Sequence, residues 1–158
     1  HLFSYKFHLL SIAMFRKKYS EDLFNHWHEV EVRYRDLDTN NHVNNAVFNT
    51  YFEEARINFI TTIPEFIKGL EEKKSFVLVK CTIEYLKPII YPSKLLIGSG
   101  CTEVGNSSIE ALQAIYDADS HQLLSVALTK GVWFNLNTQR PERIPEIADI
   151  DAYMVEKD

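Results

Sequence analysis

One run of apolar residues at helical spacing limits the folds open to this chain more than any other feature. The residues that share this spacing are Phe48, Phe52, Ala55, Phe59 and Ile63. Side chains three or four positions apart line one face of an α-helix, so the run predicts a helix over residues 45–62. Asn44 or Asn45 is placed to cap its N-terminus. Pro64 ends or kinks this helix and predicts a second helical segment over residues 64–73.

The segments on either side of the helix have a hydrophobic period of two, which is the period of a β-strand. Before the helix, residues 28–36 place Val30, Val32 and Tyr34 on one face. After it, the strands are predicted over residues 77–85, 94–104, 107–117 and 121–136. The first of these four carries its apolar residues at odd positions. Short polar turns separate the last three strands, which predicts hairpins between them.

This order of one strand, one long helix and four further strands predicts an α+β fold. An antiparallel sheet of about five strands would pack one face against the helix. Gly98, Gly100 and Gly131 fall inside predicted strands and indicate bulges or a close approach of another chain segment. The other face and the two edges of such a sheet would stay open, which favours pairing with a second copy of the chain.

The length of 158 residues fits one domain. We expect a single domain over residues 26–146, an N-terminal extension over 1–25 and a C-terminal tail over 147–158. Residues 1–13 are apolar but too short and too interrupted for a membrane span. They are either sequence from upstream of a start at Met14 or an amphipathic helix that touches a membrane or a partner, and we expect no stable membrane insertion.

Charge and cysteine content exclude several classes of function. The net charge of −5 argues against a nucleic-acid partner. Cys81 and Cys101 are too few for a disulfide framework, and we interpret both as reduced core residues of a cytoplasmic protein. His26 and His28 alone do not make a metal site. We therefore expect neither a metal nor a cofactor.

Polar residues gather between the first strand and the long helix. They are Asp36, Asp38, Asn40, Asn41, His42, Asn44 and Asn45. A helix N-terminus offers unpaired N–H groups and a positive dipole end, which stabilise an oxyanion. A carboxylate beside it can attack a carbonyl carbon or activate water, so the segment suits carbonyl hydrolysis. The same residue types also form turns and helix caps, and both interpretations stay open on the residues alone.

Two stretches carry a family resemblance. Residues 35–45 read RDLDTNNHVNN and residues 51–56 read YFEEAR. Together they resemble the signature of the hotdog-fold acyl thioesterases, the 4-hydroxybenzoyl-CoA thioesterase-like family. Residues 137–145 also resemble the end of that family's last strand, and the resemblance covers about 27–146. It implies a long central helix wrapped by an antiparallel sheet, in a homodimer or homotetramer whose sheets join edge to edge with the active sites at the interface.

The resemblance also implies roles for particular residues. Asp38 matches the catalytic carboxylate, and Asn40 and His42 match the residues that accompany it. Asn45 matches the position whose backbone N–H polarises the thioester carbonyl; some bacterial members carry a histidine there, whereas this chain has its histidine at position 42. Residues expected to contact substrate are Tyr34, Val43, Asn44 and Arg140.

Several of these expectations have a plain alternative. Tyr34 forms either a pocket wall or part of the core. Arg140, with Arg143 and Lys130, meets the phosphates of coenzyme A or forms a solvated basic rim.

The function implied is hydrolysis of acyl-CoA or acyl-ACP thioesters, within fatty acid metabolism. A thiol leaving group has a pKa of about 8.5, so its thiolate departs without a strong general acid. Asp38 would act as a nucleophile or as a general base on water. Two other classes share the fold: hydratases or dehydratases, and proteins that bind acyl thioesters without hydrolysing them.

Overall fold

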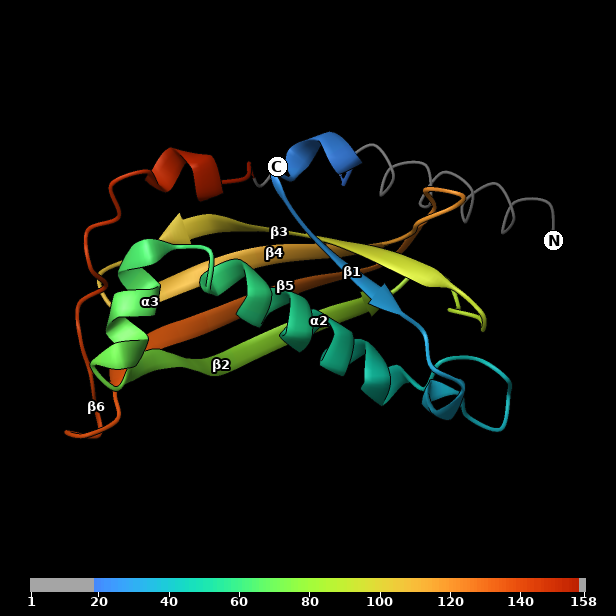
Figure 1. The fold of residues 1–158 in the computed structure, drawn as a ribbon, viewed down its shortest axis with the longest axis horizontal. Helices are drawn as coiled ribbons and strands as arrows, with labels where there is room; N and C mark the ends of the chain where they lie inside the picture. Colours follow the sequence, from blue (N-terminus) through green and yellow to red (C-terminus); the bar gives the residue numbers. More distant parts are fainter. Residues whose placement is uncertain (1–18, 157–158) are drawn as a thin grey trace, which may run out of the picture.

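The computed structural model describes residues 19–156, which form one antiparallel sheet curled around a central helix (Figure 1). The strands are β1 (His26–Glu31), β2 (Lys74–Tyr85), β3 (Lys94–Val104), β4 (Ser108–Asp117), β5 (Leu123–Asn135) and β6 (Arg140–Pro141). The helices are α2 (Asn45–Ile60) and α3 (Pro64–Glu71), with short 3-10 helices η1 (Glu21–Leu23), η2 (Tyr34–Asp36) and η3 (Ile150–Tyr153). The strand order is β1-β3-β4-β5-β2, and β6 pairs with β5. This arrangement is the hotdog fold, as predicted.

The long helix α2 is buried along the predicted stripe. Its side chains at Phe48, Phe52, Ala55 and Phe59 are at most 3 % exposed, and they pack against the inner face of the sheet. Asn44 caps the helix, since its Oδ1 accepts a 2.9 Å hydrogen bond from the Ala46 N–H. Pro64 occupies the first turn of α3, where its missing N–H costs nothing.

The hairpins also lie where the turns predict them. β3 pairs with β4 and β4 with β5 in consecutive antiparallel ladders. β2 closes the sheet on the other side of β5 and leaves its second edge unpaired within residues 19–156. The sheet therefore ends in β1 on one side and β2 on the other.

The outer face of the sheet is covered rather than open, which differs from the prediction. Phe24 and Val155, from the two ends of the described chain, pack there with residues of β4 and β5. Two strand glycines make room for them. A Cβ at Gly98 would lie 2.5 Å from Phe24, and a Cβ at Gly100 would lie 2.3 Å from Val155. Residues 19–25 and 147–156 thus pack on the domain, and the boundaries at 26 and 146 stay predictions.

The predicted strand over residues 28–36 ends early. After Glu31 the chain turns into η2, because the Asp36 carboxylate accepts the Arg33 N–H and closes a tight turn. Val30 and Val32 are buried as expected, but Tyr34 is 75 % exposed. Tyr34 is therefore not a core residue, and Asp36 takes the buried position.

A register shift between Leu78 and Lys80 changes which side of β2 faces the helix. Before it, Phe76 packs inward, and after it Ile83 and Tyr85 do. Val77 and Val79 consequently point outward and are 42 % and 57 % exposed, which contradicts the predicted odd-numbered apolar face in the first half of β2, whereas Ile83 and Tyr85 follow it in the second half.

The cysteine prediction is half right, since Cys101 is buried but Cys81, on β2, is exposed. None of the helices within residues 19–156 is long and apolar enough to cross a membrane. Both interpretations of residues 1–13 concern a segment outside the described residues.

Candidate active site

A pocket of about 400 Å³ opens where the loop after η2 meets the start of α2. It brings together six residues that the sequence analysis named: Asp38, Asn40, His42, Val43, Asn44 and Asn45. Phe48 of α2 and the end of β2 with the residues after it complete the wall. All the residues predicted to act on the thioester carbonyl therefore border one cavity.

The loop that carries Asp38 is held by its own backbone. The Asp38 N–H donates to the His42 carbonyl at 2.9 Å, and the Asn41 N–H returns a 3.1 Å bond to the Asp38 carbonyl. Asn41 adopts a positive φ of 58°, which asparagine tolerates better than most residues. Because of this tight turn, the His42 and Asp38 side chains border the same pocket.

The Asp38 carboxylate is half-buried and only lightly engaged. Its Oδ1 accepts a 2.8 Å hydrogen bond from the Asn40 N–H. No other hydrogen bond or ion pair joins this carboxylate to any residue between 19 and 156. The second oxygen is thus available to a water molecule or a substrate.

The first backbone N–H of α2, that of Asn45, is also available to a ligand. The Asn44 side chain accepts a hydrogen bond from the Ala46 N–H, and the Asn44 carbonyl accepts one from the Val47 N–H. The Asn45 N–H is one of the donors that a helix cannot satisfy internally, and it has no acceptor among the described residues. Together with the helix dipole it provides a place for negative charge on a carbonyl oxygen.

Asp36, the first carboxylate of the segment, plays a different part from Asp38. It is 2 % exposed and accepts hydrogen bonds from the Arg33 N–H at 3.0 Å, from Arg33 Nη2 at 2.9 Å and from the Tyr51 hydroxyl at 2.7 Å. Burial alone would raise the pKa of Asp36, but these donors outweigh it and lower that pKa. Asp36 is an anchor for the loop and not an open reactive group.

Tyr85 is a pocket residue that sequence reasoning missed. Its hydroxyl donates to the Asn45 carbonyl at 3.3 Å, and its ring packs edge-on against Phe48 with centroids 5.0 Å apart. It follows Asn45 by forty positions and belongs to a different strand. Its place at the end of an alternating segment was visible, but nothing local in the sequence linked it to the loop.

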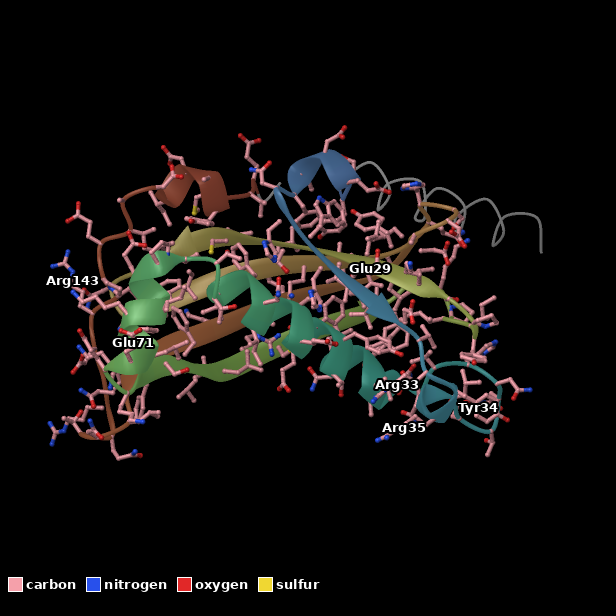
Figure 2. All side chains as sticks on the ribbon, viewed as in Figure 1. Glu29, Arg33, Tyr34, Arg35, Glu71 and Arg143 are labelled. Atoms are coloured by element: carbon pink, nitrogen blue, oxygen red, sulfur yellow. The ribbon has the colours of Figure 1, made fainter. Side chains whose placement is uncertain are left out.

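Two predicted substrate contacts lie outside this pocket. The Tyr34 ring packs against Tyr91 instead, with centroids 5.6 Å apart. Arg140 lies on β6, which Figure 1 places at the opposite end of the sheet from the start of α2. Figure 2 likewise separates Arg143 from Tyr34 by the length of the molecule. Arg140 is therefore not a residue of this pocket, and its contact with substrate stays a prediction.

The geometry suits attack on an activated carbonyl. A half-buried carboxylate, an exposed histidine and amide, and an unsatisfied helix N-terminus border one cavity. The carboxylate supplies a base or a nucleophile, and the helix N-terminus supplies an electrophilic contact. Fold and site together define a hotdog-fold hydrolase.

Comparison with known proteins identifies the family. The sequence profile of the thioesterase-like superfamily matches residues 32–151. The chain is also 30 % identical over 112 residues to the long-chain acyl-CoA thioesterase FadM of Escherichia coli (strain K12), covering 71 % of this chain and 85 % of that protein. The chain belongs to the thioesterase-like superfamily, and it is a thioester hydrolase.

Solved structures agree with this assignment. The probable thioesterase YbaW from Escherichia coli superposes with a TM-score of 0.72 at 27 % identity, over 82 % of this chain and 98 % of that one. A thioesterase from Thermus thermophilus, solved in complex with coenzyme A and Zn, superposes with a TM-score of 0.67 at 31 % identity, over 78 % of this chain and 94 % of that one.

Proposed function

We propose that this chain hydrolyses acyl-CoA thioesters to a free acid and coenzyme A, with Asp38 as the catalytic carboxylate. One observation carries the proposal: the Asp38 carboxylate and the unsatisfied N–H of Asn45 border the same pocket. Relatives support coenzyme A as the carrier, since FadM is named for acyl-CoA and the Thermus thermophilus structure holds coenzyme A. Acyl-ACP is the alternative carrier.

In this proposal the thioester carbonyl oxygen accepts the Asn45 N–H at the start of α2. Negative charge that develops on this oxygen is stabilised by that N–H and by the helix dipole. Asp38 either attacks the carbonyl carbon to form a mixed anhydride or removes a proton from an attacking water. His42 and Asn40 orient the water or the carboxylate by hydrogen bonds. The thiolate leaves without a dedicated acid, in keeping with its low basicity.

We also propose that the enzyme works as a homodimer, or as a homotetramer of such dimers, joined through β2. Val77, Leu78 and Val79 are between 42 % and 57 % exposed along this unpaired edge. A long apolar edge strand is costly to leave open, because its free N–H and C=O groups invite another strand. A second copy of β2 would cover it and continue the sheet.

Thiol release from a panel of substrates tests the proposed activity. The panel comprises short-chain, long-chain and aromatic acyl-CoAs, and the matching acyl-ACPs. We expect turnover of at least one acyl-CoA, detected with a chromogenic thiol reagent. Turnover of acyl-ACPs alone would replace coenzyme A as the carrier. Binding by calorimetry without release of thiol would contradict the hydrolase and favour a binding protein.

Isotope labelling tests whether Asp38 acts as the nucleophile. A single turnover with enzyme in excess is run in ¹⁸O-labelled water. If Asp38 is the nucleophile and water attacks the Asp38 carbonyl carbon of the anhydride, the label appears in the Asp38 carboxylate. If Asp38 is a general base, or if water attacks the acyl carbon of the anhydride, the label appears only in the product acid.

A further inference from the structure

Two tyrosine rings are exposed beside the candidate active site and contact each other. Tyr34, in η2, is 75 % exposed, and Tyr91, in the loop between β2 and β3, is 45 % exposed. Their rings pack edge to face, with centroids 5.6 Å apart and planes inclined at 78°. Contiguous exposed apolar surface marks binding sites more often than single exposed side chains do. We refer to these two rings as the tyrosine pair.

The tyrosine pair is close to the Asp38 pocket through both of its chain segments. Tyr34 precedes Asp38 by four residues, and Tyr91 follows Pro88, which lines the pocket, by three. An extended chain spans at most about 3.6 Å per residue, so each tyrosine lies within about 14 Å of the pocket wall. Figure 2 places Tyr34 at the end of the molecule where α2 begins in Figure 1.

Backbone hydrogen bonds hold the two segments of the tyrosine pair together. The Val32 N–H donates to the Ser93 carbonyl at 2.9 Å and ties the loop between β2 and β3 to the segment before η2. The Val43 N–H donates to the Ile89 carbonyl at 2.9 Å and ties the same loop to the loop of the active site. The tyrosine pair therefore has a fixed place relative to the pocket, and a ligand that spans both loses little binding free energy to ordering the loops.

Arg35 adds a positive charge beside Tyr34. Its side chain is exposed, and its guanidinium makes no hydrogen bond or ion pair with any residue between 19 and 156. Arg33 differs, because its guanidinium is held by the Asp36 carboxylate at 2.9 Å. Lys87, in the loop that carries Tyr91, lines the Asp38 pocket. Guanidinium groups bind phosphate oxygens through paired N–H donors, so a phosphorylated ligand fits this end of the molecule.

Coenzyme A has the length and the chemical groups that match this arrangement. Its pantetheine arm carries the thioester at one end and the phosphates and adenine at the other. Fully extended, the arm is about as long as four peptide residues, roughly 14 Å. A thioester whose carbonyl lies at the Asn45 N–H therefore brings the nucleotide to the tyrosine pair, and nucleic-acid bases stack on aromatic rings. A protein carrier needs a much larger surface, about 800 Å² on each partner.

We propose that the tyrosine pair and Arg35 bind the nucleotide end of coenzyme A and favour acyl-CoA over acyl-ACP. The adenine stacks on the Tyr34 ring, whose edge-on contact with Tyr91 fixes its orientation, and Arg35 binds a phosphate. The proposal rests on the proposed function, because it requires the thioester to lie at Asp38. A contact far from the reacting carbonyl is made equally in the ground state and in the transition state, so it lowers KM and leaves kcat unchanged.

Truncated substrates isolate the nucleotide contact. Acyl-pantetheine keeps the thioester and the arm but lacks the phosphates and the adenine. We expect Tyr34→Ala and Arg35→Ala each to lower kcat/KM for acyl-CoA at least fivefold through KM, the lower end of the range for one base stacked on an aromatic ring. Both variants should keep kcat/KM for acyl-pantetheine within twofold of the wild type. Tyr34→Phe retains the ring and should retain the wild-type value for both substrates.

Lys68→Ala is the matched control for Arg35→Ala. Lys68 is exposed on α3, at the opposite end of the molecule from η2 (Figure 1), so its loss removes one positive charge far from the tyrosine pair. We expect wild-type kinetics with both substrates. Calorimetry with coenzyme A alone gives a second readout that does not depend on turnover, and the Kd should rise at least fivefold in Tyr34→Ala.

The outcomes separate this proposal from the proposed function. Equal losses on acyl-CoA and acyl-pantetheine would overturn the nucleotide site and make the roles of Tyr34 and Arg35 structural. Equal losses on acyl-CoA and acyl-ACP would overturn the selectivity for the carrier. A larger loss on acyl-CoA in Arg140→Ala than in Arg35→Ala would overturn the site by placing the phosphates at β6.

A wild-type protein that releases no thiol from any acyl-CoA would overturn the proposed function itself. Calorimetry then still decides the nucleotide site. Coenzyme A bound by the wild type and bound more weakly by Tyr34→Ala would support the site, whereas equal binding by the two proteins, or none by the wild type, would overturn it.

Discussion

The Tyr51 hydroxyl, on α2, donates a 2.7 Å hydrogen bond to the buried carboxylate of Asp36, two residues before Asp38. Arg33 donates to the same carboxylate from its backbone and from its guanidinium. One buried anion therefore ties the end of the first strand and the side of the central helix to the loop that carries Asp38. The Asn44 N–H adds a further tie, since it donates to the Asp36 carbonyl at 2.9 Å.

Tyr51→Phe removes one donor from this anchor and leaves the ring in place. We expect a loss of about 1 to 2 kcal/mol in the free energy of unfolding, the usual cost of withdrawing a hydrogen bond from a buried charged group. We also expect kcat to fall severalfold with KM little changed, because the Asp38 loop loosens. Urea denaturation and steady-state kinetics measure the two effects. Tyr153→Phe is the control, because the Tyr153 hydroxyl makes no hydrogen bond within residues 19–156. Equal effects of the two variants would contradict the anchor.

The lowered pKa of Asp36 predicts a particular loss of stability in acid. A carboxyl whose pKa is lower in the folded state stabilises the protein above its unfolded pKa, about 3.9, and this contribution disappears as the pH falls through the folded pKa. In the wild type, the free energy of unfolding should therefore decrease as the pH is lowered below about 4. The Asp36→Asn variant should be less stable than the wild type at pH 7, and its free energy of unfolding should decrease less steeply as the pH is lowered. Equal slopes in urea denaturation across pH 3 to 7 would contradict this.

The close contact between Gly100 and Val155 predicts a steric cost. Gly100→Ala places a Cβ 2.3 Å from the Val155 side chain, and overpacking of this kind costs about 1 to 3 kcal/mol. Val155→Ala in the same chain should restore part of that loss. Gly105→Ala is the control, since its Cβ would lie 3.3 Å from the nearest atom. Thermal and chemical unfolding measure all three. A double variant no more stable than Gly100→Ala would contradict the contact.

Pairing through β2 predicts that a central charge separates the protomers. In the full-length antiparallel register, position 79 lies opposite Lys80 of the second copy. Val79→Lys then sets like charges against each other twice across the axis, and like charges directly opposite are destabilising. Light scattering after size exclusion should register a shift toward monomer. Ile90→Lys, at a residue that lies outside β2 in the chain and is 56 % exposed, should leave the mass unchanged. A Val79→Lys protein that stays dimeric would place the interface elsewhere.

The sequence was most informative where one local pattern decided the structure. The stripe from Phe48 to Phe59 defined α2, because only a helix places those residues on one face, and the last residue of the predicted stripe, Ile63, lies beyond the end of α2. Polar turns similarly located the hairpins between β3, β4 and β5. The cluster around Asp38 was found because its members are consecutive in the chain and a short loop keeps them together.

Features that depend on contacts between residues far apart in the sequence were not predicted. The bulge after Leu78 reverses which face of β2 is buried, and hydrophobic alternation carries no mark of it. Tyr34 was predicted to share a face with Val30 and Val32, as a pocket wall or as part of the core, because the turn that Asp36 closes was not recognised. Tyr85 comes from a strand far from the Asp38 loop in the chain, so its place in the pocket becomes apparent only in the folded protein.

The most direct test of the account is thiol release by Asp38→Asn. The substitution keeps the size of the side chain and removes its charge. We expect kcat on the best acyl-CoA to fall by about 100-fold or more, the scale for loss of a general base or nucleophile. Asp119→Asn, at an exposed residue in the turn between β4 and β5, should keep wild-type turnover. Wild-type turnover in a correctly folded Asp38→Asn protein would contradict the central role given to this carboxylate.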